Sequence, residues 1–147
     1  MAFSLAPHGI LLAVPVILLA TDAAWIYDEV DAGLSDPATT VLRVRAGQDV
    51  LPAVRSHNPD LVIVDLQIGN MGGIAVSLAI RQEEGMDRLT PRPVMLLLDR
   101  AVDVFLAQTS GADGWMIKPV DGFRLRRAAN ILLAGDPYTE GVPAPQG

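Results

Sequence analysis

Three carboxylates and one ammonium group lie at the ends of apolar runs of this chain, and these residue types can do chemistry. Asp65 and Asp99 directly follow such runs, Asp22 follows one after Thr21, and Lys118 follows the short run WMI. If Asp22 and Asp65 point toward one another, their oxygens and a backbone carbonyl of the loop after Asp65 could hold a hard cation such as Mg²⁺. The Asp65 carboxylate could itself act as a nucleophile, and the Lys118 ammonium could neutralise an incoming phosphoryl oxygen.

Such a convergence requires strands that end at one edge of a sheet, and the sequence predicts five strands. Apolar runs alternate with helical patterns, which is typical of an α/β domain. Three runs are apolar throughout, as expected of central strands covered on both faces. The central strands are predicted at 16–20, 61–64 and 94–98, and the edge strands at 41–45 and 115–117.

Helices are predicted between and after these strands, at 22–34, 48–57, 73–84, 101–108 and 121–134. The apolar spacing predicts which side chains face inward. In the third helix these are Ile74 and Leu78, with Ile80 as a further candidate. In the last helix they are Phe123, Ala128, Ile131 and Leu132, with the arginines on a solvated face. Right-handed crossovers then give a three-layer, doubly wound, five-stranded parallel sheet that binds ligands at the carboxyl ends of its strands.

The length of 147 residues, half of them hydrophobic, indicates one domain, which we place at 14–134. Residues 1–13 are predicted to form a loose leader rather than a signal peptide, because no basic residue precedes the apolar run. Residues 135–147 are rich in proline and glycine, which predicts a disordered tail.

The overall charge and the cysteine count narrow the function. The net charge of -6 provides no general attraction to nucleic acid or anionic membranes, so we expect protein or small-molecule partners. The chain has no cysteine, which is compatible with the cytoplasm.

Two segments carry a resemblance to a known family. After Asp65 the chain reads LQIGNMGG, which aligns without a gap to a pattern of two residues, Met, Pro, any residue, Met, an acidic residue and Gly. The segment GADGWMIKP at 111–119 aligns with Gly-Ala-x-Gly-aromatic-apolar-apolar-Lys-Pro. Over about 14–134 the chain therefore resembles the receiver domain of bacterial two-component response regulators, the family of the chemotaxis response regulator. This resemblance implies a flavodoxin-like sheet with strand order 2-1-3-4-5.

The resemblance also implies a role for each matching residue. Asp65 would be the phosphoacceptor, and Lys118 would contact the phosphoryl group. Pro119 would follow a cis peptide bond that aims the lysine into the site. Trp115 matches the aromatic switch position of the family, and it could equally be an ordinary packing residue of the edge strand.

The implied metal pocket and switch depart from the family pattern. Asp22, Asp65 and the backbone carbonyl of Gln67 would bind Mg²⁺. Thr21 replaces a further acidic ligand, which should weaken that site. Leu98 replaces the Thr or Ser whose hydroxyl contacts the phosphoryl group and couples it to the aromatic switch, and leucine has no hydrogen-bond donor. These departures indicate an atypical receiver.

Some residues near the predicted pocket keep more than one interpretation. Asp22 could cap the first helix instead of binding a metal. Asp99 is expected to cap the short fourth helix, with a substitute role in the pocket as the alternative. Gly69 and Gly72 replace the proline and the acidic residue of the family motif, which predicts a looser loop.

Three classes of function follow. The first is a stand-alone signalling receiver, not an enzyme, with a sensor histidine kinase as phosphoryl donor, Mg²⁺ as cofactor and an unknown downstream protein. A homodimer could form through the fourth helix, fifth strand and fifth helix, where Phe105 and Leu106 are expected to be exposed. The alternative is an interaction module with a vestigial pocket that works without phosphorylation. A nucleotide- or flavin-binding enzyme is disfavoured, because the loop ATDAAW lacks a phosphate-binding glycine motif.

Overall fold

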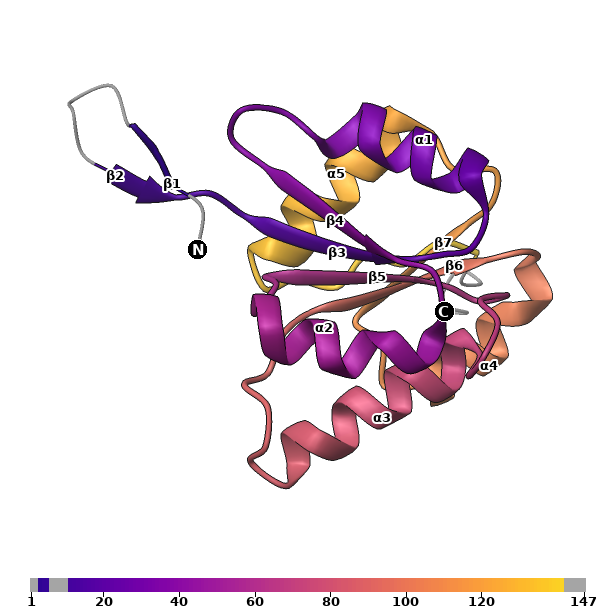
Figure 1. Cartoon of the computed structure of the whole chain (residues 1–147). Helices are drawn as coiled ribbons and strands as arrows, with labels where there is room; N and C mark the ends of the chain where they lie inside the picture. Colours follow the sequence, from indigo (N-terminus) through magenta and orange to yellow (C-terminus); the bar gives the residue numbers. More distant parts are fainter. Residues whose placement is uncertain (1–2, 6–10, 142–147) are drawn as a thin grey trace, which may run out of the picture.

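A five-stranded parallel sheet forms the centre of the molecule in the computed structural model, which describes residues 3–5 and 11–141 (Figure 1). Its strands are β3 (Val16–Ala20), β4 (Thr40–Val44), β5 (Leu61–Asp65), β6 (Val94–Leu98) and β7 (Gly114–Ile117). They lie in the order β4-β3-β5-β6-β7, which is 2-1-3-4-5 when these strands are counted along the chain. The predicted fold class and strand order are confirmed.

Helices cover both faces of this sheet. They are α1 (Ala24–Leu34), α2 (Val50–His57), α3 (Gly73–Gly85), α4 (Val104–Thr109) and α5 (Gly122–Leu133), with the 3-10 turns η1 (Gly47–Asp49) and η2 (Ala101–Asp103). Figure 1 shows α1 and α5 on one face, and α2, α3 and α4 on the other. The fold therefore has three layers, and the strands point their carboxyl ends toward a common edge.

The core consists of two apolar clusters, one on each face of the sheet. Every residue of β3, β5 and β6 is buried. Successive side chains of a strand point to opposite faces, so Val62 and Val64 pack toward α2 and α3 while Leu61 and Ile63 pack toward α1 and α5. Each such side chain contributes about 1.5–3 kcal/mol by leaving water. Central strands of this kind hold the carboxyl edge of the sheet in place.

The predicted inward face of α3 is wrong at Leu78, which is 48% exposed. Ile80, the further candidate, is buried as predicted, together with Val76, which was not predicted. Residues four apart share one face of a helix, whereas a residue midway between them lies on the opposite side. Burial of Val76 and Ile80 therefore turns Leu78 outward.

The same geometry corrects α5. Its buried residues are Leu125, Ala128, Ala129 and Leu132, which recur at the spacing of one helical face. The prediction that Phe123 faces inward is wrong. Phe123 lies two residues before Leu125, on another side of the helix, and is 82% exposed.

The two termini of the described chain also differ from expectation. Residues 1–13 were expected to form a loose leader, but β1 (Phe3–Leu5) and β2 (Leu11–Ala13) pair as an antiparallel two-stranded sheet that extends away from the main sheet (Figure 1). Residues 1–2 and 6–10 lie outside the described residues. In the described part of the chain, no helix is both long and apolar enough to cross a membrane.

At the other end, residues 135–141 belong to the segment that we expected to be a disordered tail. This segment lies beside β7, and Tyr138 forms a parallel bridge with Gly114 of that strand. Pairing of this kind uses backbone groups alone, so it leaves no periodic pattern in the sequence. Residues 142–147 lie outside the described residues.

Candidate functional site

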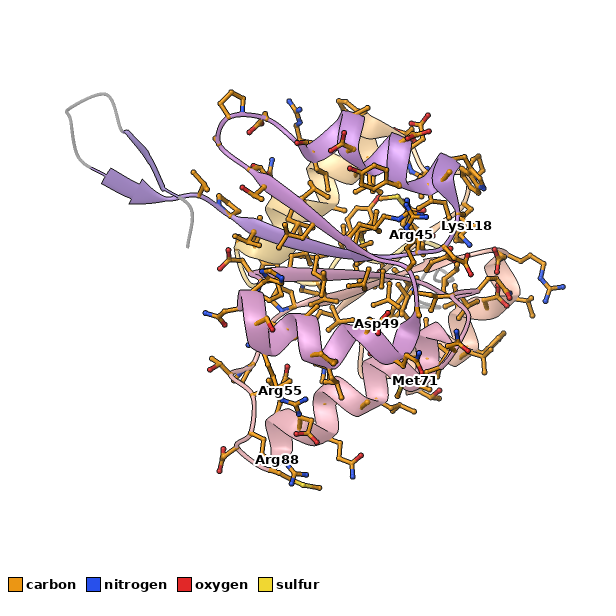
Figure 2. All side chains as sticks on the ribbon, in the orientation of Figure 1. Arg45, Asp49, Arg55, Met71, Arg88 and Lys118 are labelled. Carbon is orange, nitrogen blue, oxygen red and sulfur yellow. The ribbon has the colours of Figure 1, made fainter. Side chains whose placement is uncertain are left out.

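Asp65 and Lys118 meet at the carboxyl edge of the sheet. Asp65 is the last residue of β5, and Lys118 directly follows β7, so the two side chains converge over the end of β6, which lies between them. Nζ of Lys118 lies 2.6 Å from Oδ1 of Asp65, and only 2% of Asp65 is exposed. Figure 2 labels Lys118 at this edge. The pair is a partly buried, charge-assisted hydrogen bond.

The backbone around Lys118 is held by its neighbours. Its N–H donates to the carbonyl of Leu98 at 2.8 Å. The Lys118–Pro119 peptide bond is cis, the geometry that the family resemblance implied. The guanidinium of Arg124 donates to the carbonyls of Ile117 at 3.0 Å and Pro119 at 2.9 Å, one on each side of the lysine. These contacts fix the direction from which Lys118 enters the pocket.

Thr21, at the end of β3, makes a direct contact with Asp65. Its hydroxyl donates to Oδ2 of Asp65 at 2.8 Å and accepts the N–H of Ala23 at 3.1 Å. The backbone N–H of Gln67 donates to Oδ1 of Asp65 at 3.0 Å. Both carboxylate oxygens of Asp65 are therefore paired, which a buried charge requires. The residue that replaces a metal ligand thus became a hydrogen-bond donor to the central carboxylate.

Asp99 is a member of the pocket, and the expectation that it caps the fourth helix is wrong. Its Oδ1 lies 2.8 Å from Nζ of Lys118, and its Oδ2 accepts from Nε2 of Gln67 at 2.7 Å. The N-cap residue of η2, the turn that precedes α4, is Arg100. Asp99 therefore takes the alternative place considered above, in the pocket. The largely buried ammonium of Lys118 attracts it as a second carboxylate.

The charges in this pocket shift the pKa values of two groups. Burial acts to lower the pKa of Lys118, but hydrogen bonds and attraction from Asp65 and Asp99 outweigh it, so the pKa lies above its usual value. Burial acts to raise the pKa of Asp99, but hydrogen bonds from Lys118 and Gln67 outweigh it, so the pKa lies below its usual value. Lys118 is therefore held as an ammonium and Asp99 as a carboxylate.

Asp22 lies beside the loop that follows Asp65. Its Oδ2 accepts the N–H of Gly69 at 3.4 Å, and its side chain is exposed. The N-cap residue of α1 is Ala23, so the interpretation of Asp22 as the helix cap is wrong.

The oxygen ligands that the sequence suggested for Mg²⁺ form a sparse set. They are the carboxylates of Asp22 and Asp65 and the backbone carbonyl of Gln67. Mg²⁺ keeps several waters and often takes only one or two carboxylates, so these residues meet the minimum. The hydroxyl of Thr21 competes for Oδ2 of Asp65, and residues 3–5 and 11–141 contain no group of three His, Cys, Asp or Glu that could hold a metal. The donor types thus suit Mg²⁺, while the hydrogen bond from Thr21 already occupies one oxygen of Asp65.

The loop after β5 is pinned to the neighbouring turn η1, contrary to the predicted loosening. The N–H groups of Gly47 and Gln48 donate to the carbonyls of Gly69 at 2.9 Å and Asn70 at 2.8 Å. A Cβ atom on Gly47 would lie 1.8 Å from the carbonyl oxygen of Met71, so only glycine allows this approach. Asn70 and Met71 adopt positive φ angles of 53° and 84°. The loop, near which Figure 2 labels Met71, is held by contacts rather than by its own composition.

Leu98 and Trp115 lie together in the apolar cluster beneath α2, α3 and α4. Leu98 is fully buried, and Trp115 is 7% exposed. The indole Nε1–H of Trp115 donates to the carbonyl of Glu140 at 3.0 Å. The aromatic residue is thus bound to the C-terminal segment, whereas Leu98 contributes only an apolar side chain to the cluster that both residues share.

A doubly wound sheet with an aspartate–lysine pocket at its carboxyl edge defines a class of signalling domain. The family model described as the response regulator receiver domain matches residues 17–130. This chain belongs to that family. Receiver domains take part in two-component signalling, interact with histidine kinases and downstream effectors, and generally bind Mg²⁺ for phosphorylation.

Curated relatives agree with this family. The transcriptional regulatory protein AfsQ1 of Streptomyces coelicolor is 30% identical over 125 residues, which are 83% of this chain and 53% of AfsQ1. The DNA-binding response regulator MtrA of Mycobacterium tuberculosis is 36% identical over 99 residues, which are 60% of this chain and 41% of MtrA. This chain therefore spans about half the length of the curated relatives that it matches.

Solved structures share the fold. The chemotaxis response regulator CheY4 of Vibrio cholerae superimposes with a TM-score of 0.70 at 21% identity, over 80% of this chain and 97% of CheY4. The receiver domain of NarL from Mycobacterium tuberculosis gives a TM-score of 0.72 at 22% identity, over 84% of this chain and 99% of that domain. At this identity the likeness concerns the fold alone.

Three residues, Gln67, Arg124 and Glu140, contribute to the site and its surroundings in ways that the sequence did not predict. The side-chain amide of Gln67 binds Asp99, although only its backbone carbonyl was expected to matter. Glu140 and Arg124 hold the strand that carries Lys118, although the first was assigned to a tail and the second to a solvated face. For Asp99, the signal was its position directly after a fully apolar central strand.

Proposed function

We propose that the chain is an atypical cytoplasmic receiver module that acts in phosphorelay signalling through protein contacts, with Asp65 as the phosphoacceptor. The observation that carries this proposal is the 2.6 Å contact between Lys118 Nζ and Asp65 Oδ1 at the carboxyl edge of the sheet. A sensor histidine kinase is the proposed donor, and a downstream protein reads the result. In this proposal the chain is a signalling domain and not an enzyme that turns over a small-molecule substrate.

In the proposed reaction, a carboxylate oxygen of Asp65 attacks the phosphorus of the donor. The bond between phosphorus and the leaving group breaks, the leaving group takes the electron pair, and an acyl phosphate forms on Asp65. Lys118 remains an ammonium and neutralises a phosphoryl oxygen. Asp22, Asp65 and the carbonyl of Gln67 would hold Mg²⁺, which supplies further charge neutralisation when bound.

The test is incubation of the full chain with acetyl phosphate and Mg²⁺, followed by intact-mass measurement. The expected result is a gain of one phosphoryl group in the wild-type chain and none in Asp65→Asn. Beryllofluoride provides a second readout, because it should change the fluorescence of Trp115 in a Trp25→Phe background. Equal labelling of both proteins, or no labelling and no spectral change in either, would sink the proposal.

A second candidate function is an interaction module that works without phosphorylation. It is favoured by the bonds that already fill the pocket, namely Thr21 to Asp65 and Lys118 to Asp99, and by the apolar side chain of Leu98. A binding assay with a captured partner separates the two functions when it compares wild type with Asp65→Ala and Asp65→Glu. Equal affinity of all three proteins favours the interaction module, whereas a change in affinity favours the phosphorylated receiver.

A further inference from the structure

The segment Tyr138–Gly141, called the strap below, crosses the edge of β7. Strand β7 is the last strand of the sheet, so one side of its backbone is open for pairing. The N–H of Trp115 donates to the carbonyl of Tyr138 at 2.9 Å, and the indole of Trp115 donates to the carbonyl of Glu140 at 3.0 Å. The strap therefore fills this open edge, much as a bound peptide adds to a sheet.

The side chain of Glu140 fastens the strap. Its Oε1 accepts the backbone N–H of Ile117 at 2.9 Å and Nη2 of Arg124 at 2.5 Å. Its Oε2 accepts Nε of Arg124 at 3.1 Å and the hydroxyl of Tyr138 at 2.5 Å. A carboxylate that receives two parallel bonds from one guanidinium is among the strongest ion pairs in proteins. Glu140 thus joins the strap to both β7 and α5.

The strap ends against α4. A Cβ atom on Gly141 would lie 2.7 Å from Cδ1 of Ile117 and 3.3 Å from Cγ2 of Val104, and the φ angle of Gly141 is +70°. On the outer side of α4, Phe105 and Leu106 are 72% and 52% exposed, as predicted. The strap therefore crosses the face formed by α4, β7 and α5, which is the face considered above for a homodimer.

We propose that the edge of β7 is a peptide-binding site that the strap occupies in cis, with Glu140 as its latch. While the strap is bound, the face formed by α4, β7 and α5 is closed to a strand from another molecule. Release of the strap is thus a requirement for any strand pairing at this edge. This inference goes beyond the proposed function and does not depend on phosphorylation of Asp65.

The geometry also makes the strap removable. It is short and is joined to α5 through Gly135, whose φ angle of +93° favours glycine. A tethered segment of this kind acts at an effective concentration on the order of millimolar, so its contacts need only modest intrinsic affinity. A short segment at the end of a domain can open locally without unfolding of the whole domain.

Amide hydrogen exchange on the full chain tests the latch. Glu140→Ala should accelerate exchange of the Trp115 and Ile117 amides at least tenfold relative to wild type. The amides of β6 should keep their protection, which shows that the domain is folded. Thr139→Ala is the matched control, because that side chain is exposed within the same segment. Unchanged exchange at Trp115 and Ile117 in folded Glu140→Ala would overturn the assignment of Glu140.

A peptide with the sequence DPYTEG, added to the full chain, tests the site. The probe is the indole N–H signal of Trp115 in ¹⁵N spectra, isolated by Trp25→Phe, since the chain has two tryptophans. Millimolar peptide should return this signal to its wild-type position in Glu140→Ala and leave the wild-type chain unchanged. The peptide DPYTAG should have no effect on either protein. Failure of DPYTEG to restore the signal, in a variant whose Trp115 exchange is accelerated, would show that the edge is not a peptide site.

Discussion

Nζ of Lys118 lies 2.8 Å from Oδ1 of Asp99, a carboxylate placed immediately after the position that Leu98 occupies. Strand β6 thus brings a negative charge to the pocket where the family pattern has a hydroxyl one residue earlier. Lys118 is shared between this carboxylate and Asp65. A phosphoryl group on Asp65 must therefore compete with Asp99 for the ammonium.

Asp99→Asn should accelerate labelling of Asp65 by acetyl phosphate several-fold, because the ammonium loses its competing carboxylate. The measurement is the time course of intact mass in the presence of Mg²⁺. Asp87→Asn is the control, since it removes the same charge at an exposed position beyond the far end of α3. Labelling at or below the wild-type rate would contradict competition for Lys118.

The stability of the domain should depend on pH through this same pair. The pKa of Asp99 is lowered in the folded state. The ionised carboxylate therefore stabilises the folded state above the unfolded pKa of about 3.9, and this stabilisation is lost as the pH falls through the folded pKa. The pKa of Lys118 is raised, so its contribution is present below about 10.4 and is lost as the pH rises through the folded value. Urea unfolding should therefore show wild type more stable than Asp99→Asn at pH 7, with a smaller difference at pH 3. A difference that grows toward pH 3 is the contrary result.

Thr21→Asp should make stability depend on Mg²⁺. Thr21 is fully buried against Asp65, so a second carboxylate there costs about 3 kcal/mol when no cation is present. For a domain of this size, that cost lowers Tm by roughly 10 °C in EDTA. Addition of Mg²⁺ should recover much of the loss in thermal unfolding.

The control for this experiment is Thr21→Val, which removes the hydroxyl without adding charge. Its Tm should be the same in EDTA and in Mg²⁺. If Thr21→Asp also has the same Tm in both conditions, Asp22 and Asp65 do not form part of a magnesium site.

Leu98→Thr should destabilise the domain by about 2–3 kcal/mol, because it leaves a cavity and buries a hydroxyl in an apolar cluster. Leu98→Val, which has nearly the same shape as the threonine variant, separates the loss of volume from the added hydroxyl. Beryllofluoride should stabilise Leu98→Thr more than Leu98→Val in urea unfolding, since only threonine can donate to the bound group. Equal stabilisation would place position 98 out of reach of the Asp65 ligand.

The fold and the Asp65–Lys118 contact could be predicted from the sequence because both follow from local patterns. Apolar runs such as LVIV identify strands buried on both faces, and parallel strands must end at one edge. The partners of Asp65 were not predictable in this way. Thr21 was interpreted as a lost ligand, whereas its hydroxyl points to Asp65 and replaces a metal–oxygen contact with a hydrogen bond.

Other differences arise where neighbouring segments decide the conformation. The glycines after Asp65 predicted a loose loop, but hydrogen bonds from Gly47 and Gln48 fix it. Proline- and glycine-rich composition predicted a tail after α5, but composition carries no information about an open strand edge nearby or about the guanidinium of Arg124, which binds Glu140.

The bridge between Gly114 and Tyr138 also limits how this sheet can assemble with copies of itself. With the strap bound, β4 is the one open edge of the five-stranded sheet in the described chain. A sheet with one open edge can pair once, and growth then stops at two molecules. A sheet with both edges open can extend in either direction, which is the geometry of fibres. By covering β7, the strap therefore limits pairing between sheet edges to two molecules.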